Sequence, residues 1–188
     1  MQKSGYKKRD LYTLVELAQN GDVKALEYLI RKNQNHIYAV FSYLVEKKHD
    51  ISDLTQETLI KMAKSLPNLR EIKSFKTWLD QIITSVYYDY TRKKAQSPVE
   101  INSEKLNEIK DKLGCEPGEK CLYSEVEKLI RASLLNLPSE LRICLILREY
   151  EGLSYSDIAK LTNSAIGTVK SRISRARIRL QKELKEYI

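Results

Sequence analysis

The sequence predicts an all-α protein made of two small helical domains joined by a flexible linker. Three observations predict this class. Apolar residues recur at spacings of three and four along most of the chain, which is the pattern of helices and not of strands. The 188 residues include only six glycines and four prolines, so few breakers interrupt the pattern. One stretch near the middle has scattered charge, glycine and proline without an apolar period, as linkers do.

We place the first domain at residues 1–94. A helix is expected over residues 10–19, where Asn20 and Gly21 end it and Asp22 caps the next helix. Apolar residues then continue at helical spacing to about residue 45. A further helix is expected to begin at Ser52 or Asp53, and an acidic residue suits the positive end of that helix.

The last helix of the first domain is expected to be long and to start at Ser74. Its inward stripe includes Trp78, which predicts a core tryptophan. An outward tyrosine beside basic residues suits stacking on an unpaired base, and an ordinary exposed tyrosine is the alternative. The expected outward face consists of Thr77, Gln81, Thr84, Tyr88 and Arg92.

Residues 95–121 form the predicted linker, and residues 122–188 form the second domain. Its first helix is expected from about Leu122. Leu137 and Pro138 open the next helix, where the missing N–H of proline costs nothing. Gly152 ends that segment.

Two helices joined by a tight turn are expected over residues 153–185. Ser154 is placed to cap the first, with Asp157 as its partner in a capping box. Asn163 marks the turn, because asparagine tolerates a left-handed backbone. The second helix begins near Ile166.

The second of these helices separates an apolar stripe from a basic face. Val169, Ile173, Ala176, Leu180 and Leu184 fall on one side. Ser171, Ser174 and Arg175 point away from that stripe, with Lys170 and Arg177 on one flank and Arg172 and Arg179 on the other. Short polar and arginine side chains between cations suit a helix that reads the major groove. A solvated basic face is the alternative.

Composition points to a polyanionic partner. The net charge is +8 and the sequence pI is about 9.2, which favours nucleic acid or an anionic membrane. No run of about eighteen apolar residues and no signal-peptide pattern is visible, so a cytoplasmic protein is expected.

No metal or cofactor site is expected. The three cysteines, Cys115, Cys121 and Cys144, and the two histidines do not have the spacing of a metal signature. A disulfide between Cys115 and Cys121 remains a weaker alternative. His49, Asp53 and Glu57 lie at intervals of four, but we expect His49 to precede the helix and the three not to share a face.

Two separated groups of motifs resemble the extracytoplasmic-function (ECF) group of bacterial sigma factors. The segments Asp53-Leu54-Thr55-Gln56-Glu57, Phe75-Lys76-Thr77-Trp78-Leu79 and Asp89-Tyr90-Thr91-Arg92-Lys93 resemble sigma region 2. Leu137-Pro138 and the segment from Leu153 to Leu180 resemble sigma region 4. The resemblance covers nearly the whole chain outside the N-terminal tip and the linker. It implies a region 2 helical bundle followed by a region 4 helix-turn-helix.

The resemblance also implies roles for individual residues in a protein that is not an enzyme. Core RNA polymerase would be bound at the beta-prime clamp helices, and the second domain would contact the beta flap. An anti-sigma factor is a further expected partner. The residues implied for the clamp helices are Asp53, Gln56 and Glu57. Those implied at the promoter minus-10 element are Arg70, in the loop of residues 69–73, and Ser85, Asp89, Arg92 and Lys93. Those implied at the minus-35 element are Thr168, Lys170, Ser171, Arg172, Ser174 and Arg175.

The chain departs from the family pattern at three positions. Ser85 stands where many members carry Asn, which leaves the preferred minus-10 base open. Thr162 replaces a usual apolar residue, and Ala165 stands where Pro or Ser is frequent.

Two other functions compete with the sigma factor. A stand-alone dimeric helix-turn-helix regulator explains residues 153–185 but leaves the first domain without a role. A metal-dependent nuclease using Asp50, Asp53 and Glu57 requires carboxylates from several elements to converge, whereas these crowd the start of one helix.

Overall fold

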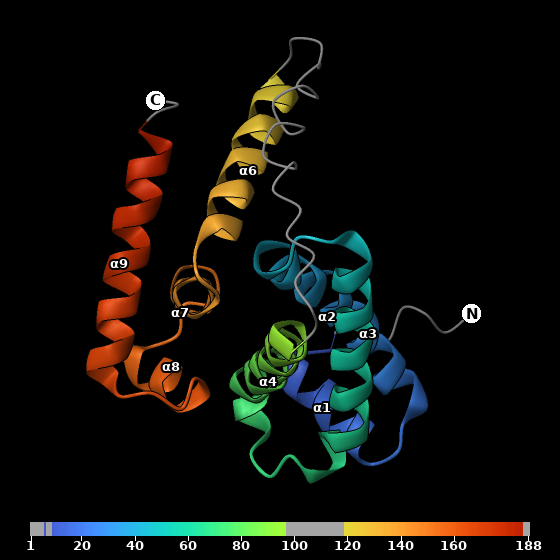
Figure 1. Cartoon of the computed structure of the whole chain (residues 1–188). Coiled ribbons are helices and arrows are strands. Elements are labelled where there is room, and N and C mark those ends of the chain that lie inside the picture. Colours follow the sequence, from blue (N-terminus) through green and yellow to red (C-terminus); the bar gives the residue numbers. More distant parts are fainter. Residues whose placement is uncertain (1–5, 7–8, 97–118, 186–188) are drawn as a thin grey trace.

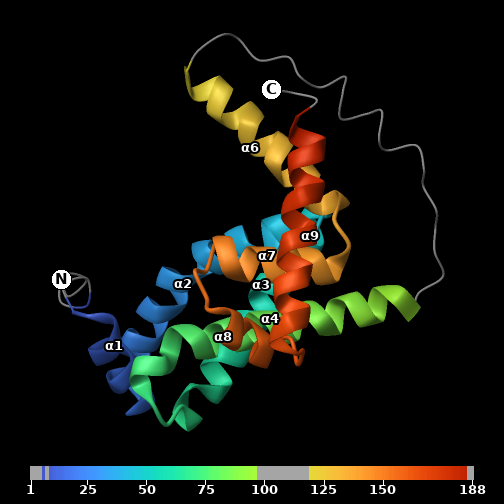
Figure 2. The ribbon, with the colours of Figure 1, turned by 90° about the vertical axis from the view of Figure 1, so that its left-hand side faces the viewer.

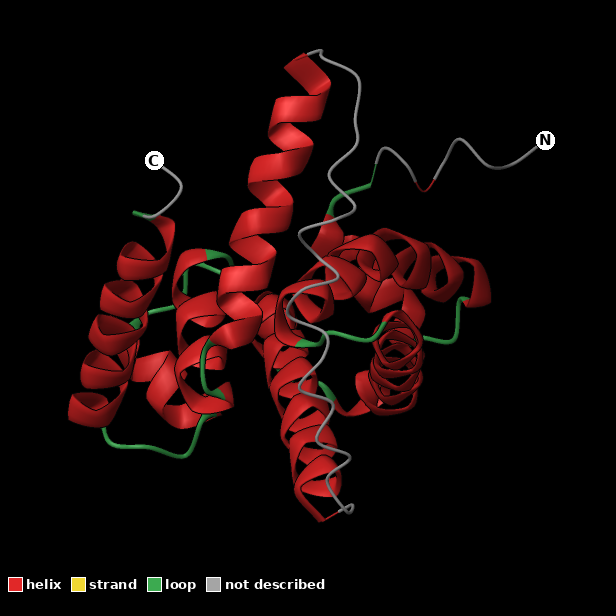
Figure 3. Cartoon of the chain, turned by 45° about the horizontal axis from the view of Figure 1, so that its top comes forward, coloured by secondary structure: helices red, strands yellow, loops and turns green. Residues whose placement is uncertain are grey.

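The computed structural model describes residues 6, 9–96 and 119–185, and the side chains of these except for residues 119–124. All regular structure in this part of the chain is helical, as the sequence predicts (Figures 1 and 3). Most of the predicted linker, including Cys115, and the side chain of Cys121 lie outside the described residues. Cys144 is a buried free thiol.

The first domain contains α1 (Leu11–Gln19), α2 (Val23–Leu44), α3 (Lys48–Ser65) and α4 (Phe75–Gln96). Asp10 caps α1 by accepting a 2.9 Å hydrogen bond from the Thr13 amide. Asp22 caps α2, and Gly21 has a φ of 88°, which glycine adopts without strain. The predicted break between these two helices is confirmed.

The start predicted for α3 is wrong. The helix begins at Lys48, and the Ile51 amide donates to the carbonyl of Lys47 at 3.1 Å. Asp53 therefore lies in the second turn and does not cap the helix. Asp50 takes the first-turn acidic position, and its Oδ2 also accepts a 2.8 Å hydrogen bond from the hydroxyl of Tyr90 on α4. This long-range contact anchors the helix start.

The connection from α3 to α4 is more ordered than the loop that the sequence predicts. Two 3₁₀ turns, η2 (Leu66–Asn68) and η3 (Ile72–Ser74), occupy most of it. The side chain of Gln19 on α1 donates to the carbonyls of Leu66 and Leu69 at 3.0 and 2.7 Å. These bonds tie the connection to α1, and the Leu66 carbonyl also accepts from the Leu69 amide within η2.

The second domain contains α6 (Glu119–Asn136), α7 (Ser139–Glu149), α8 (Tyr155–Leu161) and α9 (Ile166–Leu184). The predicted linker is thus too long at both ends, because α4 continues to Gln96 and α6 starts at Glu119. Pro138 precedes α7, and its carbonyl accepts from the amides of Leu141 and Arg142. A proline at this position loses no helical hydrogen bond.

The two domains pack against each other. Helix α7 lies against α2, and α8 lies against α4 (Figure 2). The guanidinium of Arg131 on α6 donates to the carbonyls of Ser42, Val45 and Glu46 at the end of α2. Buried apolar side chains from both domains form one cluster.

This packing corrects the predicted outward face of α4. Thr84 is buried and Tyr88 is half-buried, with a hydroxyl that has no hydrogen-bond partner among the described residues. Burial raises the pKa of Tyr88. The helical period placed both residues opposite the core of the first domain, but the second domain covers that side. Trp78, predicted in the core, is half-buried.

Among residues 9–96 and 119–185, none of the helices has both the length and the apolar character that crossing a bilayer requires.

Candidate nucleic-acid interface

The turn between α8 and α9 has the predicted local geometry. The hydroxyl of Ser154 accepts from the Asp157 amide at 3.1 Å and donates to the Asp157 carboxylate at 2.6 Å. Asn163 has a φ of 46°, in the left-handed region. The capping pair fixes the start of α8, and Asn163 turns the chain after α8. Together they set the orientation of α9 relative to α8.

The departures at Thr162 and Ala165 are accommodated. Thr162 is buried, and its hydroxyl donates to the Ile158 carbonyl at 2.8 Å, so the polar group is satisfied. Ala165 precedes α9 without a side-chain capping bond.

Replacing Asn163 by alanine is expected to destabilise the second domain by about 1 kcal/mol, because a Cβ-bearing residue without a polar side chain tolerates the left-handed region poorly. Asn163→Gly is the matched control, and it should unfold at the same denaturant concentration as the wild type or a higher one. Equilibrium urea unfolding measures both. Equal stability of the alanine and glycine variants would contradict the prediction.

One side of α9 is open to solvent. Val169, Ile173 and Ala176 are buried, as predicted, while Leu180 is half-buried. We call the opposite side the polar side of α9; it consists of the exposed residues Lys170, Ser171, Ser174 and Arg175. The guanidinium of Arg175 lies along the helix, 3.1 and 3.2 Å from the hydroxyl and carbonyl of Ser171. Polar and cationic side chains of this kind recognise base edges and phosphates.

The flanking cations are less free than the sequence suggests. Arg172 is largely buried, 2.9 Å from both the Glu140 carboxylate and the Ser164 hydroxyl. Arg177 pairs with Glu149 on α7. Thr168 is half-buried, and its carbonyl accepts from the Ser171 hydroxyl. The two ion pairs, to Glu140 and Glu149, join α9 to α7. Both acidic partners are distant from α9 in the sequence, so the helical period did not reveal these pairs.

Two of the three residues on α3 that are predicted to bind polymerase have exposed side chains. Asp53 and Gln56 are exposed. Glu57 is half-buried and forms a 2.8 Å ion pair with Lys61. Lys61 also lies 3.6 Å from Asp89 on α4, and the bond to Glu57 is the main reason that the pKa of Lys61 is raised. No motif in the sequence singles out Lys61, which links the predicted polymerase-binding residues to the predicted minus-10 residues.

Four of the five residues predicted for the minus-10 element are exposed. Ser85, Arg92 and Lys93 are exposed on α4, and Arg70 is exposed in the segment between η2 and η3. Asp89 is half-buried, and its carboxylate lies 2.9 Å from the Arg92 guanidinium. The arrangement places cations near the end of α4, where a nucleic-acid backbone would be attracted.

Two of the three acidic residues invoked for a nuclease, Asp50 and Glu57, make other contacts. Asp50 binds Tyr90 and lies 3.0 Å from His49. Although His49 lies within α3, against expectation, it does not form a metal-binding group with Asp53 and Glu57. Within the described residues, the group with suitable metal-ligand geometry lies elsewhere, at His36, Asp80 and Glu151.

An apolar groove of about 930 Å³ opens between α6, α7 and α9. Ile130 on α6 is exposed in it, and so is the ring of Tyr150. Within the described residues, the apolar side of α6 is therefore only partly covered. The lining residues include Leu134, Ile146 and Leu180.

Comparison with known proteins identifies both domains. Residues 29–97 match the family described as sigma-70 region 2, and residues 127–180 match sigma-70 region 4. The ECF RNA polymerase sigma-E factor of Haemophilus influenzae is 34% identical over 179 residues, covering 91% of this chain and 93% of the relative. The RNA polymerase sigma-H factor of Pseudomonas aeruginosa is 33% identical over 186 residues, covering 93% of this chain and 94% of the relative.

Solved structures agree with this assignment. The sigma factor RpoE of Bartonella quintana, in complex with the anti-sigma factor NepR, is 28% identical and has a TM-score of 0.65, covering 87% of this chain and 98% of that one. CnrH, in complex with the cytosolic domain of CnrY, is 18% identical with a TM-score of 0.65, covering 94% and 97% of the two chains, and it shares the fold.

The match over residues 29–97 accounts for the domain that a stand-alone operator-binding regulator leaves without a role. Sigma factors are transcription initiation factors that direct core RNA polymerase to promoters. With region 2 and region 4 in this order and relatives alike over nearly their whole length, the chain belongs to the ECF family of RNA polymerase sigma factors.

Proposed function

We propose that this sigma factor divides promoter recognition between its two domains. The second domain reads the minus-35 element through the polar side of α9, and Thr168 and Arg172 support that side from its flanks. The first domain holds the minus-10 element with Arg70, Ser85, Asp89, Arg92 and Lys93. The exposed polar side of α9, set by the Ser154 cap and the Asn163 turn, carries this proposal.

Core polymerase is proposed to bind at two places. Asp53, Gln56 and Glu57 on α3 are oriented for the beta-prime clamp helices, because two of them are exposed and the third lies beside them on the same helix. The apolar groove between α6, α7 and α9 suits the beta flap, since it exposes Ile130 and has a largely apolar lining. An apolar surface of this kind typically marks a protein contact.

The two DNA contacts need not be strong individually. Domains on one tether bind the second site at a high effective concentration once the first is engaged, provided that the linker spans the two sites. In this view the chain acts in the cytoplasm, has no catalytic activity of its own, and is regulated by an anti-sigma factor. In vitro transcription with core polymerase and a genomic promoter library tests the proposal. Failure to direct specific initiation would overturn it.

The Gln56→Ala variant is expected to bind core polymerase several-fold more weakly and to reduce transcription, while the fold is kept. Removing an exposed side chain changes stability by less than about 0.5 kcal/mol, whereas it removes a polar contact at the interface. Affinity for core polymerase, measured by competition with the wild-type protein, checks this. Gln81→Ala, at an exposed glutamine on α4, is the matched control. Unchanged core affinity of Gln56→Ala would contradict the role.

A further inference from the structure

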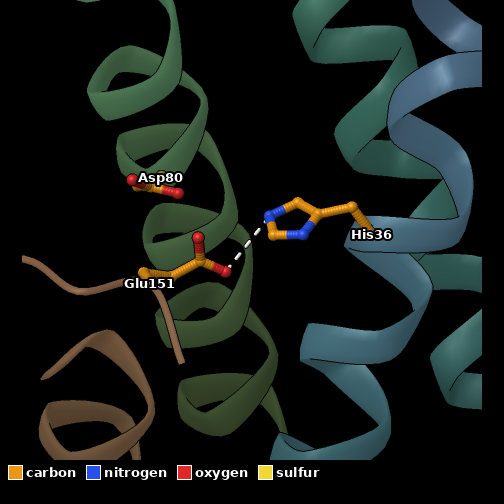
Figure 4. A group of neighbouring side chains, drawn as sticks. All are labelled: His36, Asp80 and Glu151. Atoms are coloured by element: carbon orange, nitrogen blue, oxygen red, sulfur yellow. Dashed lines mark ion pairs between the residues drawn. The ribbon is translucent and has the colours of Figure 1, made fainter. Parts of the chain in front are cut away.

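Three potential metal ligands converge between the two domains. His36 comes from α2, Asp80 from α4, and Glu151 from the loop between α7 and α8 (Figure 4). One ligand atom of each residue lies within 4.8 Å of those of the other two. The imidazole Nε2 is 3.1 Å from Oε1 of Glu151. The three side chains are far apart in the sequence, and only the packing of the domains brings them together.

The cluster places two buried carboxyl groups beside a single imidazole. Asp80 is 1% exposed and Glu151 is 6% exposed. Oδ2 of Asp80 and Oε2 of Glu151 have no hydrogen-bond partner among the described residues. The half-buried His36 offers at most one positive charge, and the other cation that acts on Asp80 is Lys76, whose side chain is exposed. A buried carboxylate is energetically costly unless it is paired with a cation or binds a metal.

We propose that His36, Asp80 and Glu151 form a binding site for a divalent transition-metal cation, with Zn²⁺ as the best fit. One imidazole nitrogen and two carboxylate oxygens are a ligand set that Zn²⁺ accepts, and a water or another ligand completes its tetrahedron. Calcium and magnesium favour six or more oxygen ligands and are less suited to a site that includes an imidazole. The three ligand atoms now lie within 4.8 Å of one another, so coordination at about 2.0–2.2 Å requires the side chains to move closer together.

Burial, and after it the charge of Glu151, raises the pKa of Asp80 to about 7. This is the behaviour of a carboxyl group that lacks a sufficient counter-charge, and it supports the geometric reasoning without being needed for it. A bound divalent cation supplies that charge.

Because the ligands come from both domains, the cation is expected to stabilise their packed arrangement. A ligand that binds only this arrangement shifts the equilibrium towards it by mass action. His36 and Asp80 belong to the first domain and Glu151 to the second. The site therefore couples metal binding to the separation of the domains, whatever promoter the protein recognises.

The full-length protein, stripped of metal with a chelator, provides the test. Cys115→Ser and Cys121→Ser are included in every sample so that these thiols do not compete for the metal. Zn²⁺ is titrated by calorimetry, and Co²⁺ is titrated by visible absorption, which reports a low-coordinate site with nitrogen and oxygen ligands. We expect one cation per chain, and an increase in the thermal midpoint of unfolding when Zn²⁺ is added.

Asp80→Asn and His36→Gln are each expected to weaken Zn²⁺ binding by about tenfold or more, as changes around metal sites commonly do, and to abolish the thermal shift. His49→Gln is the matched control, since His49 also lies beside a carboxylate, at 3.0 Å from Asp50, but outside the cluster. It should bind like the parent protein. Far-UV circular dichroism confirms folding, and Glu151→Gln provides a third variant if one of the others fails to fold.

Absence of Zn²⁺ binding to the parent protein would overturn the proposal. So would equal affinities for the cluster variants and His49→Gln. Because the readouts are metal affinity and thermal stability, neither result depends on polymerase or promoter binding.

Discussion

Replacing Arg142 by alanine is expected to lower the free energy of unfolding by roughly 2 to 4 kcal/mol. The guanidinium of Arg142, on α7, donates to the carbonyl of Leu44 at the end of α2 at 2.6 Å. It also donates to the carbonyls of Leu135 and Leu137 at 2.6 and 2.7 Å. The change leaves three part-buried carbonyls without their donor, and a buried polar group that loses its partner costs more than an average hydrogen bond contributes.

Urea unfolding followed by far-UV circular dichroism and by the fluorescence of Trp78 measures this effect. Trp78 is the single tryptophan of the chain and lies in α4, so its signal reports on the first domain. If Arg142 holds the domains together, the two signals should coincide in the wild type and separate in the variant.

Arg179→Ala is the matched control for this measurement. Arg179 is exposed on α9, and its removal should change stability by no more than about 0.5 kcal/mol. A similarly small change for Arg142→Ala would show that the three carbonyls find other donors when the guanidinium is lost.

The Arg175→Ala variant is expected to weaken binding to the cognate minus-35 duplex by about 1 to 3 kcal/mol if the guanidinium binds a base edge. Arg175 is exposed on the polar side of α9 and lies against Ser171. Those contacts are within one exposed helix, so exchanging them for contacts to a base costs little. Arginine binds the edge of guanine with two hydrogen bonds, which is the source of the specificity.

Titrations of cognate and scrambled duplexes with the full-length protein distinguish a base contact from a phosphate contact. A base contact gives a larger loss on the cognate duplex. Equal losses on both duplexes, with a salt dependence reduced by about one charge, would show that Arg175 contacts phosphate and does not determine specificity. Arg179→Ala, on the flank of the same helix, should lose affinity equally on both duplexes.

Local signals in the sequence were sufficient for the helix-turn-helix. A cap bonds to residues two or three positions away, and the left-handed turn depends on one residue type, so Ser154, Asp157 and Asn163 could be assigned without the rest of the chain. The buried stripe of α9 followed from the helical period alone. The predictions were less accurate where long-range contacts are involved. Helix α3 begins at Lys48 and not at Ser52 or Asp53, and Asp50 in its first turn accepts a hydrogen bond from the distant Tyr90.

The all-α class, the order of the two sets of motifs and the exposed polar side of α9 could be predicted from the sequence, because these depend on residue type and on spacings of a few positions. The way in which the domains meet became visible only in the folded chain. The packing of the domains buries Thr84 and partly buries Tyr88. Packing within and between the domains also pairs Arg172 with Glu140 and brings His36, Asp80 and Glu151 together. Helical periodicity identifies a face that is apolar, but it cannot identify which distant polar groups will pack against the opposite face. The energies that fix this packing arise from contacts between residues that are far apart along the chain.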